Sequence, residues 1–335
     1  MQTLDKFQRP LRDLRISVTD RCNFRCPYCM PAEIFGERYE FLPRKELLTF
    51  EEIYRVANIA AELGVKKIRI TGGEPLVRQN VAELINMLSL IDGIEDIAMT
   101  TNAYLLKKFA KELKQSGLNR ITVSLDSIDD DIFQKMNGRG FKTKKVIEGI
   151  KEAQKVGFNE IKINSVVQKN VNDKKLLNLV EWCREENLTP RFIEYMDVGT
   201  LNNWKLDEVV PASEIIEIIS NKYPVKPIEP SYRGEVAKRY GYEDGKGEFG
   251  IISSVTQPFC GDCTRMRLSP EGQMVTCLFA SSGIELRESL RKKISDDEIK
   301  EIIKKTWNVR KDRYSEERNP SLSSRPKVEM YHIGG

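Results

Sequence analysis

The 335-residue sequence predicts an α/β fold, in which a partial parallel barrel of six βα units is followed by a smaller α+β unit. Short apolar runs alternate with longer amphipathic segments through the first two-thirds of the chain, as expected for right-handed βαβ units around a parallel sheet. After about Tyr223 the sequence becomes rich in proline and glycine, as in YPVKPIEPSYRG. We therefore predict one domain over residues 1–225 and a second over residues 226–335.

Six segments have the length and composition of buried strands, namely 14–19, 67–71, 96–100, 120–125, 160–167 and 191–195. Five segments between them have helical periodicity, namely 50–63, 81–90, 105–116, 143–156 and 174–185. Thr49 and Glu52 form a capping-box pattern before the first helix, and Gly64 can end it. Six units are too few to close an eight-stranded barrel, so we expect an open one. A further charged helical stretch is predicted over residues 284–307.

Four sequence motifs follow predicted strands: a cysteine-rich loop after Thr19, TGGEP after Ile70, TTN after Met99 and SLDS after Val123. In parallel α/β folds the ligand site lies beyond the carboxyl ends of the strands. We therefore expect these motifs to meet in one site.

Composition excludes several classes of protein. Hydrophobic residues make up 40% and charged residues 31%, as in ordinary globular proteins. No apolar run is long enough to span a membrane, and the charged N-terminal segment lacks the apolar core of a secretory signal, so we expect a cytoplasmic protein without a membrane partner. The net charge of +4 is too small to indicate nucleic-acid binding. The one histidine, His332, argues against a zinc enzyme with histidine ligands and against a catalytic Cys–His pair.

The first cysteine cluster comprises Cys22, Cys26 and Cys29, with three and then two residues between them. Three thiolates on one loop can share a metal centre. A structural zinc site needs four protein ligands, and no fourth cysteine or histidine lies nearby. A four-iron cluster held by three cysteines leaves one iron open for a small molecule, so the spacing predicts a catalytic iron–sulfur cluster.

The second cluster comprises Cys260, Cys263 and Cys277, again without an evident fourth ligand. It predicts a second iron–sulfur cluster with an open iron. Zinc remains an alternative if His332 or a carboxylate supplies a fourth ligand. Arg265 and Arg267 alternate on an extended segment beside these cysteines, so both should point the same way and could clamp an anionic substrate. Cys183, by contrast, is expected to be an ordinary buried thiol.

The CxxxCxxC motif after the first strand resembles the signature of the radical S-adenosylmethionine superfamily. The resemblance implies a partial barrel of the radical S-adenosylmethionine type. It also implies that the open iron of the first cluster binds S-adenosylmethionine, whose cleavage yields a 5′-deoxyadenosyl radical that abstracts hydrogen from a substrate. The residues it implies for S-adenosylmethionine binding are Tyr28, Gly72, Gly73, Glu74, Ser124 and Met196.

Nearly the whole chain resembles the GTP 3′,8-cyclase family of molybdenum cofactor biosynthesis. The motifs that carry this resemblance are LRISVTDRCNFRCPYCMP, IRITGGEPL, TTN, SLDS, FCGDCTRMRLSPEGQMVTCL and the terminal MYHIGG. It implies a lyase with two 4Fe-4S clusters and S-adenosylmethionine, which cyclises GTP to 3′,8-cyclo-7,8-dihydro-GTP. Hydrogen would be taken from the ribose C3′, which then bonds to guanine C8, while the open iron of the second cluster binds guanine.

The same resemblance assigns roles to further residues. The substrate-binding residues it implies are Arg15, Arg69, Thr100, Lys162, Arg191, Arg265 and Arg267. The implied catalytic residues are Arg265, Arg267, Gly334 and Gly335, the two glycines forming a tail that reaches the active site. The implied partners are GTP, a protein or small-molecule electron donor and a downstream cyclic pyranopterin monophosphate synthase, with a homodimer left open.

Two departures from the family pattern are Ala103, where glycine is common after TTN, and Pro270-Glu271 before Gly272. Neither is expected to touch a ligand. The rival interpretations are a peptide-modifying radical enzyme, an iron–sulfur electron carrier and a zinc-stapled nucleic-acid binder. The three-cysteine second site with its RxR sequence argues against the first, and Gly72-Gly73 and the motifs at successive strand ends argue against the second. The modest charge and the lack of an aromatic platform argue against the third.

Overall fold

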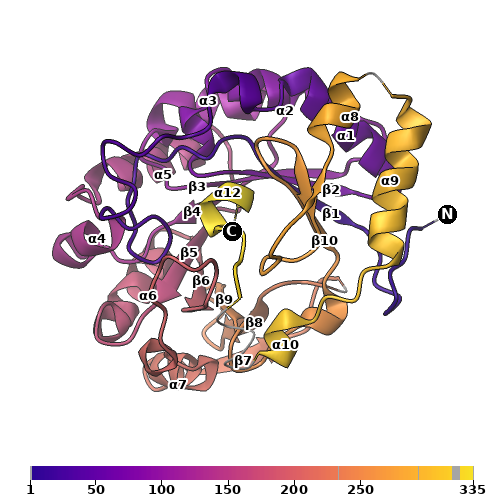
Figure 1. The fold of residues 1–335 in the computed structure, drawn as a ribbon. Helices are drawn as coiled ribbons and strands as arrows, with labels where there is room; N and C mark the ends of the chain where they lie inside the picture. The colour runs from indigo at the N-terminus through magenta and orange to yellow at the C-terminus, as the bar shows by residue number, and fades with distance from the viewer. Residues whose placement is uncertain (1, 233, 293, 319–324, 335) are drawn as a thin grey trace.

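The computed structural model describes residues 2–232, 234–292, 294–318 and 325–334. One continuous curved sheet runs through this part of the chain (Figure 1). Six neighbouring parallel strands form its centre, and these are β1 (Asp13–Ser17), β2 (Lys67–Thr71), β3 (Asp96–Thr101), β4 (Arg120–Ser124), β5 (Lys162–Val167) and β6 (Thr189–Glu194). All six predicted strands are present, with ends that differ by at most two residues.

Helices cover the convex side of this sheet (Figure 1). The predicted helices are α1 (Phe50–Glu62), α2 (Val81–Ser89), α3 (Leu106–Gln115), α5 (Lys144–Lys155) and α6 (Leu176–Glu185). The capping box of Thr49 and Glu52 at the start of α1 is confirmed. The prediction missed α4 (Asp130–Asn137) and α7 (Ala212–Ser220). Both are short, and the apolar run IIEII of α7 does not by itself distinguish a helix from a buried strand.

Segments after residue 225 extend both edges of the barrel. The strands involved are β7 (Val225–Ile228), β8 (Lys238–Tyr242), β9 (Glu248–Ile252), β10 (Arg265–Leu268), β11 (Gln273–Val275) and β12 (Ile284–Glu285). Strand β9 pairs in parallel with β6, and β10 pairs in parallel with β1. The domain boundary between residues 225 and 226 stays a prediction; the sheet is continuous across it, since β7 spans that point.

The remaining helices are α8 (Arg287–Arg291), α9 (Asp296–Asn308), α10 (Tyr314–Glu317) and α12 (Met330–Ile333). The helical stretch predicted over residues 284–307 is present as α8 and α9, although the segment begins with β12 and is interrupted after α8. Ser295 and Glu298 form a second capping box that starts a new helix, α9. Helix α12 lies across the open centre of the barrel (Figure 1).

Short 3-10 turns complete the described elements: η1 (Arg44–Glu46), η2 (Pro75–Val77), η3 (Asp173–Lys175), η4 (Leu206–Glu208) and η5 (Cys260–Asp262). Among the described residues, we find no helix with the length and apolar character needed to cross a membrane.

Candidate active site

A cavity of about 610 Å³ lies on the concave side of the sheet. Strand register decides which side chains line it, because alternate residues of a strand point to the same face. Arg267 on β10 is aligned with Arg15 on β1, and Arg15 is aligned with Arg69 on β2. Three guanidinium groups therefore enter the cavity from one row of the sheet. Arg265 lines the same cavity as Arg267, as predicted for this alternating pair.

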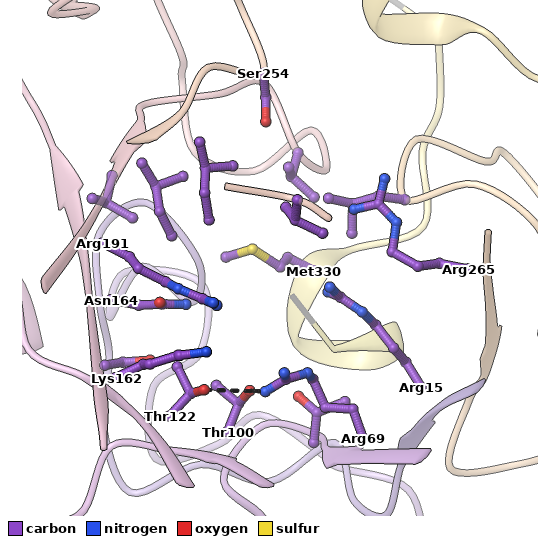
Figure 2. Close-up of a pocket in the computed structure, with 18 of the residues that line it drawn as sticks. Arg15, Arg69, Thr100, Thr122, Lys162, Asn164, Arg191, Ser254, Arg265 and Met330 are labelled. Carbon is purple, nitrogen blue, oxygen red and sulfur yellow. Dashed lines mark hydrogen bonds between the residues drawn. The ribbon is translucent and has the colours of Figure 1, made fainter. Parts of the chain in front are cut away.

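The facing wall of the cavity is also cationic. Arg191 and Lys162 extend from β6 and β5 toward Arg15 and Arg265 (Figure 2). Between the two walls, Arg69 Nη1 donates to the hydroxyl of Thr100 at 3.1 Å and to that of Thr122 at 3.2 Å. The cavity thus brings together all seven predicted substrate-binding residues.

These cations are close together and poorly hydrated. Burial, with the neighbouring charges of Arg267, Arg265 and Arg69, holds the pKa of Arg15 well below its usual value. Burial and Arg191 lower the pKa of Lys162 to about 8. Positive charge that is buried without an equal number of acids favours an anionic ligand with several oxygens.

The first cysteine triad lies on the loop after β1, where the amide of Cys29 donates to the carbonyl of Cys26 at 2.9 Å. The predicted glycines fasten this loop. Gly73 N donates to Thr19 O at 2.7 Å, and a Cβ on Gly72 would lie 2.6 Å from the same oxygen. A Cβ on Gly73 would overlap the carbonyl of Arg21. Glycine at both positions therefore lets the TGGEP loop pack against the cysteine loop.

Glu74 links two strand ends through its carboxylate. Oε1 accepts from Leu76 N at 3.0 Å and from Thr101 Oγ1 at 2.7 Å, and Oε2 accepts from Asn102 N at 2.7 Å. Burial raises the pKa of this carboxyl to about 7. Because both oxygens bond to the protein itself, the part of this loop left for a ligand is its backbone.

The other residues predicted to bind S-adenosylmethionine line the same end of the cavity. Tyr28, Ser124 and Met196 all contact it. The hydroxyl of Tyr28 donates to Asp126 Oδ2 at 2.7 Å, and Asp126 Oδ1 accepts from Val166 N at 2.8 Å. Asp126 was not predicted, although it is the third residue of the SLDS motif.

The second triad lies around η5 and the end of β11, beside cationic side chains. Arg265 Nε donates to Cys263 Sγ at 3.2 Å. Burial opposes ionisation of this thiol, but the charges of Arg265 and Arg310 outweigh it and lower the pKa of Cys263 to about 6. In the first triad, by contrast, burial raises the pKa of Cys22 to about 12.

The thiols fit iron–sulfur clusters better than single ions. All six line the cavity and none forms a disulfide. Within the described ranges, no three Cys, His, Asp or Glu side chains are arranged to hold one metal ion. His332 Nε2 lies 2.6 Å from Glu271 Oε1, so in this structure it is paired with a carboxylate rather than with the cysteines. Three thiols on one loop suit a four-iron cluster with one open iron.

The C-terminal tail passes beside Thr71, at the end of β2, and Met330 and Tyr331 of α12 line the cavity. Gly334 has a φ of +70°, and a Cβ there would lie 2.7 Å from Thr71 Oγ1. Glu329 anchors the tail by accepting from Thr200 N at 2.8 Å and from Thr200 Oγ1 at 2.9 Å. The prediction for Gly335 lies outside the described residues.

The two departures from the family pattern have structural consequences. Ala103 has a φ of +58°, a left-handed conformation that glycine adopts without cost. Glu271 Oε1 lies 2.6 Å from Nε2 of His332, two residues before Gly334, so this departure from the family pattern contacts the C-terminal helix.

Sequence reasoning missed several side chains that line the cavity, namely Lys67, Thr122, Asn164, Ser254 and Met330. The last four are labelled in Figure 2. Three of the missed side chains follow the alternation of their strands: Lys67 precedes Arg69, Thr122 precedes Ser124, and Asn164 follows Lys162 by two positions. Extending the inward-facing register of each strand would have found these three.

Two family models together match most of this chain. The Radical SAM superfamily model matches residues 16–183, and the Molybdenum Cofactor Synthesis C model matches residues 188–316. A protein named GTP 3′,8-cyclase from Staphylococcus epidermidis is 50% identical over 335 residues, covering 99% of this chain and 98% of the relative. One of the same name from Staphylococcus haemolyticus is 50% identical over 338 residues, covering 100% of this chain and 99% of the relative.

Solved structures support the fold. SuiB of Streptococcus suis, in a crystal structure with bound S-adenosylmethionine, superposes with a TM-score of 0.61 at 18% identity, covering 81% of this chain and 62% of SuiB. At that identity the likeness concerns the fold, which is the partial parallel barrel that the sequence predicts.

Proposed function

The chain belongs to the GTP 3′,8-cyclase family within the radical S-adenosylmethionine superfamily, and on this premise we propose how its own residues carry out the cyclisation of GTP. The enzyme is a lyase of molybdenum cofactor biosynthesis that forms 3′,8-cyclo-7,8-dihydro-GTP. One observation carries the assignment of residues: six cysteines in two triads and a belt of cations line the same cavity.

In our proposal Cys22, Cys26 and Cys29 hold the first 4Fe-4S cluster. Cys260, Cys263 and Cys277 are the ligands we propose for the second. When bound, the first cluster with S-adenosylmethionine supplies one-electron chemistry that removes a hydrogen atom from the ribose C3′. The protein orients these groups and keeps water away from them. The buried contact between the cysteine loop and Gly72-Gly73 supports this, since it holds the loop in one conformation.

Tyr28, Ser124, Met196 and the backbone of residues 72–74 are the groups we propose for S-adenosylmethionine binding. They lie around the first triad, at the carboxyl ends of β1 to β6. The hydrogen bond from Tyr28 to Asp126 fixes the ring of Tyr28 beside the cysteine loop. Each group therefore lines the cavity into which we expect the open iron of the first cluster to face, and where S-adenosylmethionine would bind.

The triphosphate would bind to the cationic belt. Arg15, Arg69 and Arg191 can each offer a planar pair of N–H donors to phosphate oxygens, while Lys162 acts as a point charge. Thr100 contributes by holding the guanidinium of Arg69. Arg265 and Arg267 lie beside the second triad, so they would act where the guanine end of the substrate meets the second cluster.

Turnover also needs an external reductant, and we propose an acidic redox protein or a small-molecule donor. The surface next to the first triad supports this. Between residues 132 and 147 the sequence has five cationic side chains and no acidic one. This segment runs from α4 to the start of α5, and a 2.8 Å hydrogen bond from Arg25 N to Asn137 O ties it to the cysteine loop. The five cations are Lys135, Arg139, Lys142, Lys144 and Lys145, all exposed.

We further propose that the reaction takes place in the cytoplasm and that the product passes to a cyclic pyranopterin monophosphate synthase. Sedimentation of the cluster-loaded enzyme tests whether the active form is a homodimer. The cytoplasm is our choice because it supplies both the substrate, GTP, and the cofactor, S-adenosylmethionine.

The proposed function is tested with anaerobically purified enzyme, GTP, S-adenosylmethionine and dithionite. We expect iron and sulfide for two four-iron clusters per chain, and 5′-deoxyadenosine whose formation depends on GTP. The cyclised triphosphate should appear by mass spectrometry. Zinc in place of the second cluster, or formation of 5′-deoxyadenosine with a peptide but not with GTP, would contradict the proposal.

A further inference from the structure

One hydrogen bond connects the C-terminal helix to the hairpin that carries Arg265 and Arg267. His332, in α12, places Nε2 2.6 Å from Glu271 Oε1. Glu271 lies in the turn between β10 and β11 and is 9% exposed. This contact is a short one between groups that can both be charged, which is the strong class of hydrogen bond.

The turn that receives His332 is fixed in place. Gly272 N donates to Ser269 O at 3.1 Å, and Ser269 N donates to Gln273 O at 2.8 Å, which closes the hairpin. A neighbouring loop adds a third bond, from Leu48 N to Pro270 O at 2.7 Å. Glu271 is therefore a rigid anchor, whose position follows that of the two arginines on β10.

The carboxylate of Glu271 has one oxygen paired with His332 and one that lacks a partner in the described part of the chain. Among the described residues, Glu271 Oε2 is buried and makes no hydrogen bond. Removing the imidazole would leave Glu271 Oε1 without its partner at 2.6 Å, and an unpaired buried polar group is costly. His332 is therefore held by the turn between β10 and β11 rather than by solvent alone.

The other contacts of α12 lead elsewhere. Glu329 bonds to Thr200, and the hydroxyl of Tyr331 lies 3.0 Å from that of Tyr39. These attach the helix to the loops that follow β6 and the cysteine loop. His332 alone among these three contacts reaches the arginine hairpin, and it is two residues from Gly334.

We propose that His332 and Glu271 are positioning residues that fix the C-terminal tail to the β10–β11 hairpin, so that Gly334 and the arginines Arg265 and Arg267 face the substrate together. This rests on the proposed function, in which the tail and both arginines act on GTP. Neither His332 nor Glu271 touches the substrate in this proposal; each acts through the tail.

The test is a double-mutant cycle on the cluster-loaded enzyme. We expect His332→Ala and Glu271→Ala each to lower kcat with GTP by about tenfold to a hundredfold, the range for loss of a hydrogen bond to a charged group. The double variant should lose no more than the worse single variant, because the two residues act through one contact. Iron content and the KM for S-adenosylmethionine should stay at wild-type values.

Conservative replacement separates positioning from general support of the fold. His332→Gln keeps an N–H donor that can reach Glu271, so it should keep kcat within about threefold of wild type. Gln273→Ala on the same hairpin is the matched control, since its side chain makes no hydrogen bond in the described structure. Equal loss in His332→Gln and His332→Ala, or additive losses in the cycle, would overturn the proposal.

A second measurement does not depend on GTP. Carboxypeptidase should release the C-terminal residues of His332→Ala about tenfold to a hundredfold faster than those of the wild type, because an undocked tail is accessible. Digestion at the wild-type rate would overturn the proposal even where activity falls. If wild-type enzyme made no product from GTP, the proposed function would fail, while the digestion rates would still decide the role of His332.

Discussion

Replacing Gly334 by alanine tests how tightly the tail is held in the cavity. Gly334 has φ +70° and ψ 130°, a backbone conformation that side chains rarely allow. The added Cβ would overlap the methyl group of Thr71 and lie 2.7 Å from its hydroxyl oxygen, whereas carbon atoms in contact are about 3.5–4.0 Å apart. Thr71 cannot retreat, because it is 3% exposed and its carbonyl accepts from Val18 N at 3.0 Å.

The size of the effect follows from the backbone strain at Gly334 and from the steric overlap with Thr71. A backbone outlier of this kind costs about 1–3 kcal/mol. Forcing a methyl group into a packed site costs about 1–3 kcal/mol more. At 1.36 kcal/mol for each factor of ten, the total lowers the equilibrium constant for docking of the tail by at least about thirtyfold. Since Gly334 is near the end of the chain, undocking relieves the strain and the free energy of unfolding should hardly change.

The assay is GTP-dependent formation of 5′-deoxyadenosine, measured beside the thermal midpoint of the same preparation. Gly93→Ala is the control, because Gly93 also has a positive φ, +86°, but a Cβ there would meet nothing within 4 Å. We expect Gly334→Ala to lose activity and keep its thermal midpoint. Gly93→Ala should keep its activity and have a lower thermal midpoint. Turnover of Gly334→Ala within about threefold of wild type would refute the steric argument.

Three further predictions concern charge. Burial and Arg191 lower the pKa of Lys162 to about 8, so the KM for GTP should rise above pH 8 as the ammonium deprotonates. Because the unfolded lysine keeps its proton to about pH 10.4, the unliganded protein should gain stability between these two values, measured by urea unfolding. Asp197→Asn should destabilise the protein by about 3–5 kcal/mol in the same assay, since it leaves the buried ammonium of Lys327, 2.9 Å away, without a counter-charge. Arg265→Ala should lower the iron content of the second site, because its Nε bonds to a cysteine sulfur, whereas Arg267→Ala should keep both clusters and use GTP less well.

Each of these has a clear contrary result. A KM for GTP that is constant from pH 7 to pH 9 would show that Lys162 does not bind the substrate as a cation. A loss below about 1 kcal/mol for Asp197→Asn would mean that water or another acid compensates Lys327. Equal iron content in the two arginine variants would mean that Arg265 does not support its neighbouring ligand. Lys162→Met, tested across the same pH range, separates the lysine from other groups that titrate near pH 8.

The strands and the site motifs could be predicted because their evidence is local. A parallel strand buried on its helical face shows as an apolar run, and the motifs follow such runs directly, as TGGEP follows Ile70. The alternation of Arg265 and Arg267 likewise predicts that both enter one cavity, and the structure agrees. Features that depend on residue spacing within one segment, such as strands and the motifs that follow them, can therefore be predicted from the sequence.

The closing of the barrel edges could not be predicted in this way. Arg15 pairs in register with Arg267, and Arg191 with Gly250, across separations that leave no local pattern in the sequence. The prediction instead treated the C-terminal segments as a unit packed on the barrel. The contact between Glu271 and His332 was missed for the same reason, since each residue alone looks like an ordinary polar side chain.

The distribution of charge explains what the overall composition does not. The whole chain carries a net charge of +4, yet one cavity holds at least five cations on its walls: Arg15, Arg69, Lys162, Arg191 and Arg267. Burial lowers the pKa of each, so the folded protein holds them at a cost when no anion is present. A triphosphate relieves that cost at several points at once, and a nucleoside without phosphates relieves none of it. In the function that we propose, selectivity for a nucleoside triphosphate therefore arises from the register of five strands, which places these side chains on one face, and not from an excess of basic residues in the chain.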